Sequence, residues 1–132
     1  KASLDGCLLH EALGTIWAFV GEANRFVDAE KPWELHKAAK AGDDAAAERL
    51  RTVLGDLIEA CRLIAIAAAA FLPATAPRVL AQLGYPYPYG PDGNGGPPLL
   101  QELAWAAHAA EPGTVTAAQP LFPRLETETA AD

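Results

Sequence analysis

The chain has 132 residues, which fits one domain with a core of its own, and 51% of them are hydrophobic, many of these being Ala and Leu. This composition favours helices over sheets. A net charge of −7 argues against a broad, nonspecific hold on nucleic acid such as DNA, and the longest apolar run, residues 63–72, is too short to cross a membrane.

The charge is distributed unevenly along the chain. Seven of the ten basic residues fall between positions 24 and 62, together with eight acidic residues. This pattern leaves room for a local cationic surface on an acidic protein. The chain starts with Lys1 and contains no Met, so we expect it to be a piece of a longer polypeptide.

The two cysteines, Cys7 and Cys61, lie inside helical patterns among apolar neighbours. We expect reduced, buried thiols rather than a disulfide framework. No signal peptide is visible in the sequence, and we expect a cytoplasmic location.

The first predicted helix covers residues 6–28. Its apolar positions recur at three- and four-residue steps and would share one face, which includes a single polar residue: Leu9, Leu13, Ile16, Trp17, Val20, Asn24 and Val27. Trp17 is therefore predicted to lie in the core. Pro32 suits the first turn of a helix and predicts a second helix from Pro32 to Ala41, which ends at Gly42.

A third helix is predicted to begin at a cap, Asp43 or Asp44, and to run to about Leu72. Its apolar stripe contains Leu50, Val53 or Leu54, Leu57, Cys61, Ile64, Ala68 and Phe71. The small residues 65–70 would let a neighbouring helix approach closely. A fourth helix is expected from Thr75 through Leu83, with Gly84 as its end.

The sequence changes character at Tyr85. Residues 85–98 (YPYPYGPDGNGGPP) have no periodicity and predict a loop. A short helix from Pro98 to about Ala109 follows, with Trp105 predicted in the core, and then an extended C-terminal strap. We predict an all-α, antiparallel helix bundle in one domain: a bundle region at 1–84, a loop at 85–98, and a short helix with the strap at 99–132.

Catalytic and metal-binding patterns are not evident. The three histidines, His10, His36 and His108, are far apart in sequence, and neither cysteine has a partner at ligand spacing. The glycine-rich stretch GPDGNGG follows no strand and lacks the P-loop Lys. The acids Asp43, Asp44, Glu48, Asp56 and Glu59 are expected on solvated helix faces, so we predict no catalytic, cofactor or metal site in this chain.

Three stretches together resemble the C-terminal domain of methionyl-tRNA synthetases. They are NRFVDAEKPWELHKA from Asn24, the helix pair RLRTVLGDLIEACRLIAIAAAAFLPATAPRVLAQLG at 49–84, and QPLFPRLE at 119–126. The family carries N-[KR]-[YF]-[IV]-D-x-x-x-P-W at the end of one bundle helix and PLFPR in a strap. The synthetases for leucine, isoleucine, valine and cysteine share the bundle, but D-x-x-x-P-W with PLFPR points to methionine.

The resemblance implies that the bundle reads the CAU anticodon of methionine tRNA. In the family, the Trp after the Pro stacks on an anticodon base, a role that falls on Trp33, with Pro32 fixing its presentation. Asp28 is implicated in the same site, and Asn24 and Arg25 match the first positions of the motif. The parent enzyme would be an ATP-dependent ligase whose catalytic domain, absent from this sequence, would be a partner alongside tRNA; no membrane partner is expected.

The residues themselves leave alternatives open. Unpaired bases are recognised by stacking on aromatic rings and by hydrogen bonds to their edges, which suits an indole at a helix start. Trp33 could instead cap the core, Asn24 and Asp28 could serve as helix-end hydrogen bonders, and Arg25 could pair with Asp28 or pack its stem. The family's bundle also has an earlier helix, with an Asn and an Arg four residues apart, that has no counterpart here.

Two other functions remain open. The bundle could be a protein-interaction module that docks through the strap around Leu121 and Phe122, or a small-ligand binder that uses Tyr85, Tyr87 and Tyr89.

Overall fold

The computed structural model describes residues 9–85, 103–105, 114–117 and 119–122. The first of these ranges holds four helices: α2 (Leu9–Glu30), α3 (Pro32–Lys40), α4 (Asp44–Ala68) and α5 (Ala76–Leu83). The described residues contain no strand. The predicted all-α bundle is confirmed.

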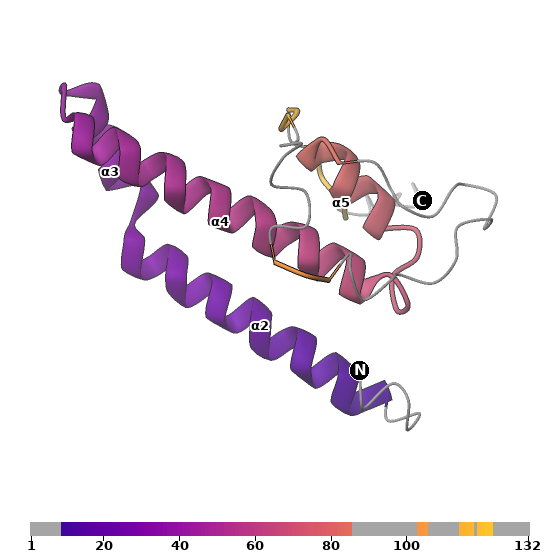
Figure 1. The fold of residues 1–132 in the computed structure, drawn as a ribbon. Coiled ribbons are helices and arrows are strands. Elements are labelled where there is room, and N and C mark those ends of the chain that lie inside the picture. Colours follow the sequence, from indigo (N-terminus) through magenta and orange to yellow (C-terminus); the bar gives the residue numbers. More distant parts are fainter. Residues whose placement is uncertain (1–8, 86–102, 106–113, 118, 123–132) are drawn as a thin grey trace, which may run out of the picture.

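The long helix α4 is the centre of the arrangement, because α2, α3 and α5 all pack against it. Figure 1 shows α2 running toward a corner at α3 and α4 returning beside it in the opposite direction. The helix α5 lies against the other end of α4, away from α3. The chain therefore forms a long helical hairpin with α3 at its closed end.

The helix ends follow local capping rules. The Asp43 carboxylate accepts a hydrogen bond from the backbone N–H of Ala46 at 2.9 Å, so Asp43, rather than Asp44, caps α4. At the end of α5, Gly84 adopts the left-handed conformation expected of a helix-ending glycine. Thr75 precedes α5 but makes no side-chain cap bond.

Two predicted helix ends shift in the structure. The first helix continues two residues beyond the predicted end at residue 28, to Glu30. The helix α4 ends at Ala68, not near Leu72, and the backbone N–H groups of Phe71 and Leu72 both bond to the Ala68 carbonyl in a turn. Pro73 disfavours helical backbone at the residue before it, which accounts for a turn at this point.

A cluster of buried hydrophobic residues lies between α4 and α5. Ala65, Ile66 and Leu80 form a buried cluster, with Val79 and Tyr85 packed against it. The small residues of α4 let α5 approach, as the sequence predicts. Farther along α4, Val53 is fully buried and Leu54 is 45% exposed, so Val53 is the core residue of that pair.

The face of α2 turned toward α4 differs from the predicted stripe. Ala12 is buried, and four further residues of α2 line cavities shared with α4. The inward positions are therefore Ala12, Ile16, Phe19, Ala23 and Phe26. These positions also recur at three- and four-residue steps, so the helix carries two overlapping apolar stripes. The prediction that Trp17 lies in the core is wrong. Trp17 belongs to the predicted stripe but not to the inward positions, and it is 62% exposed.

Three further burial predictions are wrong. Cys61 is exposed, and Trp105 is 54% exposed on a turn at 103–105, where a helix was predicted. Glu59, expected on a solvated face, is buried because Arg62, one turn later in α4, neutralises it. Cys7 lies outside the described residues, as does most of the predicted helix from Pro98.

The described part of the C-terminal strap lies along α5. The Gln82 carbonyl accepts a bond from the Thr116 backbone N–H at 2.9 Å, and the Gln82 amide donates to the Gln119 carbonyl at 3.0 Å. Arg78 donates to the carbonyls of Pro120 at 3.0 Å and Leu121 at 2.8 Å. Polar groups of α5 thus hold the described part of the strap, which contains no strand, by hydrogen bonds to its backbone.

Candidate functional site

A sharp corner joins α2 to α3 and presents the Trp of the sequence motif. Lys31, the single residue between the helices, is left-handed, with φ 46° and ψ 63°. Its N–H still bonds to the Val27 carbonyl at 2.9 Å, and its carbonyl receives the N–H of Glu34 at 2.8 Å. Right-handed helical backbone is disfavoured before Pro32, so one helix stops here and the next begins at once.

Trp33 is the second residue of α3, and its side chain is 56% exposed. Three other exposed residues of α3, His36, Lys37 and Lys40, recur at three- and four-residue steps from Trp33. They therefore share one face of the helix, which we call the Trp33 face. The opposite face, with Leu35 and Ala38, is partly buried, and α3 packs against α4.

The Trp33 face carries uncompensated positive charge. Within the described residues, neither Lys37 nor Lys40 has an ion-pair partner. All five other basic residues of this region do: Arg25 with Glu22, Lys31 with Glu34, Arg49 with Glu30, Arg51 with Glu48 and Arg62 with Glu59. The predicted cationic surface is thus narrower than the seven basic residues suggest.

The polar motif residues lie on the last two turns of α2. Asn24 and Asp28, four residues apart, are both exposed and share a face. In the described part of the chain, neither side chain has a hydrogen-bond partner. Both are therefore accessible to a ligand.

Arg25 is engaged with a different acid from the one expected. Its guanidinium donates to the Glu22 carboxylate through Nε, at 3.2 Å, and through Nη2. This hydrogen bond and the charge of Arg25 lower the pKa of Glu22, and Glu22 in turn raises the pKa of Arg25. The pairing with Asp28 that the sequence left open is not formed.

The corner is tied to α4 by an ion pair that the sequence did not suggest. Arg49 donates through Nε to Oε2 of Glu30 at 2.9 Å, and through Nη2 to Oε1. The hydrogen bond and charge of Glu30, with a smaller contribution from Asp56, raise the pKa of Arg49. The partners are 19 positions apart in sequence and belong to no local pattern, so only the fold brings them together.

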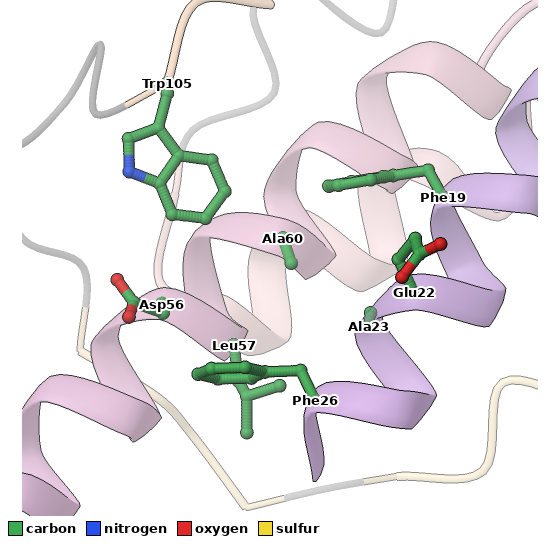
Figure 2. Close-up of a pocket in the computed structure, with 8 residues that line it drawn as sticks. All are labelled: Phe19, Glu22, Ala23, Phe26, Asp56, Leu57, Ala60 and Trp105. Atoms are coloured by element: carbon green, nitrogen blue, oxygen red, sulfur yellow. The ribbon is translucent and has the colours of Figure 1, made fainter. Parts of the chain in front are cut away.

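A separate cavity of about 430 Å³ lies between α2 and α4 (Figure 2). It is bounded by two Phe side chains of α2, by aliphatic side chains of both helices, by Trp105 above α4, and by two carboxylates: Phe19, Glu22, Ala23, Phe26, Asp56, Leu57, Ala60 and Trp105. A smaller cavity of about 220 Å³ lies along the same two helices and is lined by Ile16, Phe19 and Leu63 among others. Neither is lined by any of the motif residues Asn24, Arg25, Asp28, Pro32 or Trp33.

Other predicted features are placed only in part. Tyr85 is half-buried against the α4–α5 core, whereas Tyr87 and Tyr89 lie outside the described residues. Phe122 of the strap is 71% exposed. Among the described residues, no three His, Cys, Asp or Glu side chains are grouped to hold a metal ion, and no helix is long and apolar enough to span a membrane.

No family model and no solved structure matches the chain. Curated methionine–tRNA ligases do match it. The ligase of Clostridium tetani (strain Massachusetts / E88) is 32% identical over 131 residues, 96% of this chain and 17% of the relative. That of Bacillus subtilis (strain 168) is 32% identical over 123 residues, 89% of this chain and 16% of the relative. That of Clostridium perfringens (strain 13 / Type A) is 37% identical over 83 residues, which are 63% of this chain and 12% of the relative.

The chain thus spans less than a fifth of the length of these curated relatives. Two of them match nearly its whole length. Over nearly its whole length the chain is therefore similar to one segment of these ligases, consistent with the C-terminal domain of a methionyl-tRNA synthetase.

Proposed function

We propose that this chain binds the anticodon loop of methionine tRNA and recognises CAU, with Trp33 stacking on one base. Asp28 and Asn24 offer hydrogen bonds to base edges, and Pro32 fixes the start of α3. The chain would serve a cytoplasmic synthetase that joins methionine to tRNA with ATP. The ATP chemistry would belong to the catalytic domain of the parent enzyme, and this chain would need no cofactor of its own.

The exposure of Trp33 is the observation that carries the proposal. An indole that capped the core would be enclosed, whereas this side chain is 56% exposed in the first turn of α3. Stacking on a base is worth about 1–3 kcal/mol because it removes two apolar faces from water. Trp17 and Trp105 are exposed to a similar extent, 62% and 54%, but lie away from the motif, so exposure supports the role only together with the neighbours of Trp33.

The charge on the Trp33 face supports the same function. Lys37 and Lys40 are exposed beside the indole, and His36 shares the face. A nucleotide stacked on Trp33 would bring its flanking phosphates near these cations. A few such contacts let an acidic protein bind RNA, and they predict a shallow dependence of affinity on salt.

The other motif residues have graded roles. Asp28 accepts and Asn24 both donates and accepts, which suits the edges of unpaired bases. Arg25 would reach RNA only by exchanging its bond to Glu22 for a phosphate. We therefore expect Arg25 to contribute less than Trp33 or Asp28.

Binding of an anticodon stem-loop tests the proposal. We expect the 132-residue chain to bind a CAU stem-loop more tightly than one with a scrambled anticodon, and Trp33→Ala to weaken the CAU complex by roughly 5- to 150-fold, the value of one base stack. Trp17→Ala and Trp105→Ala are matched controls, since each removes an exposed indole elsewhere. Equal binding of both loops, or equal loss from all three variants, would reject the proposed site.

A second candidate function rests on the strap. Phe122 is the most exposed large hydrophobic residue among those described, and Arg78 holds the backbone beside it. A protein partner could cover this ring, in keeping with a bundle that serves in protein association. Phe122→Ala should then abolish co-purification of that partner without affecting the CAU complex.

A further inference from the structure

The corner that carries Trp33 is stabilised from two sides. On the α2 side, the Glu30 carboxylate receives both bonds from Arg49 of α4. On the other side, α3 packs along the same helix α4. The Glu30 side chain is only 22% exposed, although its partner is 52% exposed. The acid is thus enclosed at the junction of the three helices.

The position of Trp33 depends on this junction because the linker is so short. One residue, Lys31, separates Glu30 from Pro32, and its left-handed backbone sets the turn. Any movement of the end of α2 away from α4 would therefore change the angle between α2 and α3. Asp28 is on α2 and Trp33 is on α3, so that angle sets how the two side chains face each other.

A neighbouring ion pair on α4 lacks this property. Arg51 donates to Glu48 at 2.9 Å within one helix, and the two side chains are 75% and 73% exposed. It joins no two elements and is worth little in water. Arg51 and Glu48 are therefore matched controls, with the same charges, the same helix and no effect on the corner.

We propose that Glu30 and Arg49 are positioning residues that hold Trp33 and Asp28 in one binding geometry by clamping the α2–α3 corner to α4. This inference rests on the proposed function and assigns it two residues that need not contact RNA. The clamp acts on the free protein, before any base is bound. It lowers the cost of ordering the site, which is how preorganisation raises affinity.

The direction in which Glu30→Gln changes RNA affinity distinguishes a positioning role from a purely electrostatic effect of the lost charge. Glu30→Gln removes a negative charge, so electrostatics alone predicts tighter binding of the CAU stem-loop. Loss of the clamp predicts the opposite, an affinity roughly three- to tenfold lower as part of the stacking energy is lost. Glu48→Gln makes the same charge change and should leave affinity equal or slightly higher.

A second measurement tests the clamp without RNA. In a Trp17→Phe/Trp105→Phe background, Trp33 is the sole indole of the chain. We expect Glu30→Gln and Arg49→Met to weaken its near-UV circular dichroism and to speed its fluorescence depolarisation, with far-UV helicity unchanged. Glu48→Gln and Arg51→Met should change neither signal. The exchanged pair Glu30→Arg/Arg49→Glu should restore part of the signal and of the affinity.

The outcomes are separable. If the parent chain fails to discriminate CAU, the proposed function is wrong, while the Trp33 spectra still decide whether the clamp orders the corner. If CAU binds specifically but Glu30→Gln matches Glu48→Gln in both affinity and spectra, the clamp is refuted. A loss of helicity in Glu30→Gln would show a general structural role and would also overturn the inference.

Discussion

Arg62 and Glu59 form a buried ion pair along one turn of α4. The guanidinium donates from Nε at 2.8 Å and from Nη2 at 2.7 Å to the two carboxylate oxygens, and Nη2 also donates to the Ala104 carbonyl at 3.0 Å. Arg62 is 1% exposed. It thereby fixes the turn that carries Trp105 onto α4, next to the larger cavity (Figure 2).

Arg62→Met should destabilise the fold strongly. It leaves the buried Glu59 carboxylate facing an apolar side chain, a change that costs about 3–5 kcal/mol when one partner of a buried pair is removed. Glu59→Met/Arg62→Met removes both charges and should recover much of that loss. Urea unfolding measures the stability of both variants. If Arg62→Met is as stable as the double variant, this view is contradicted. Arg51→Met, on the exposed face, is the control and should change stability by less than about 0.5 kcal/mol.

Gly84→Ala should loosen the strap as well as strain α5. The backbone of Gly84 has φ 79°, and an added Cβ would collide with the backbone oxygen and nitrogen of Thr114, closer than any real Cβ contact. Gly42 is the matched control, since it has φ 97° but nothing within 4 Å of an added Cβ. Gly42→Ala should cost about 1–2 kcal/mol, the strain of left-handed backbone alone.

We expect Gly84→Ala to cost clearly more than Gly42→Ala in urea unfolding. Hydrogen exchange should also speed up at the Thr116 amide, which bonds to the Gln82 carbonyl. Equal costs at the two glycines, with an unchanged Thr116 amide, would mean that the strap is not held at this point.

Local rules accounted for most of the fold. Pro32, Asp43 and Gly84 mark helix ends because each imposes its own backbone geometry or cap, whatever surrounds it. Packing decides that Val53 is buried and Leu54 is not, and the sequence predicted only that one of the two lies in the core. Packing also brings α5 close to the Ala-rich end of α4, where the sequence predicted the approach of a neighbouring helix.

What the sequence missed depends on contacts between elements. The helix α2 has two overlapping apolar stripes, and only its partner α4 decides that Phe19 and Phe26 face inward while Trp17 does not. Arg49 reaches Glu30 across 19 residues. The i, i+3 spacing of Glu59 and Arg62 predicts an ion pair within the helix. The exposed pair Glu48 and Arg51 has the same spacing, so the spacing alone does not reveal that the pair Glu59 and Arg62 is buried.

Lys31 should tolerate Gly and Asn but not Val. A left-handed residue with a Cβ is strained by about 1–2 kcal/mol, and a β-branched side chain makes this backbone a true outlier. We expect Lys31→Gly to be near neutral, because relief of strain offsets the extra freedom of the unfolded chain. Lys31→Val should destabilise by roughly 1–2 kcal/mol and lower the near-UV signal of Trp33. A Val variant as stable as the parent would contradict the observed φ of 46°.

Cys61 should react slowly for an exposed thiol. The surrounding protein desolvates its thiolate and raises the pKa of Cys61, although the residue is reachable from solvent. In a Cys7→Ser background, the rate of alkylation by iodoacetamide should rise with pH through a midpoint above the value of about 8.5 for a free thiol. Unfolding in urea should bring the midpoint back to that value.

The raised pKa also has a consequence for stability. Between the pKa of Cys61 in the unfolded state and its higher pKa in the folded state, the folded state holds a proton that the unfolded state has lost. The retained proton therefore contributes fully to the free energy of unfolding below the unfolded-state pKa. This contribution disappears as the pH rises through the folded-state pKa. Cys61→Ser should therefore flatten the alkaline loss of stability in the same background. An alkylation midpoint at or below that of the free thiol would show instead that the thiol of Cys61 is fully hydrated in solution.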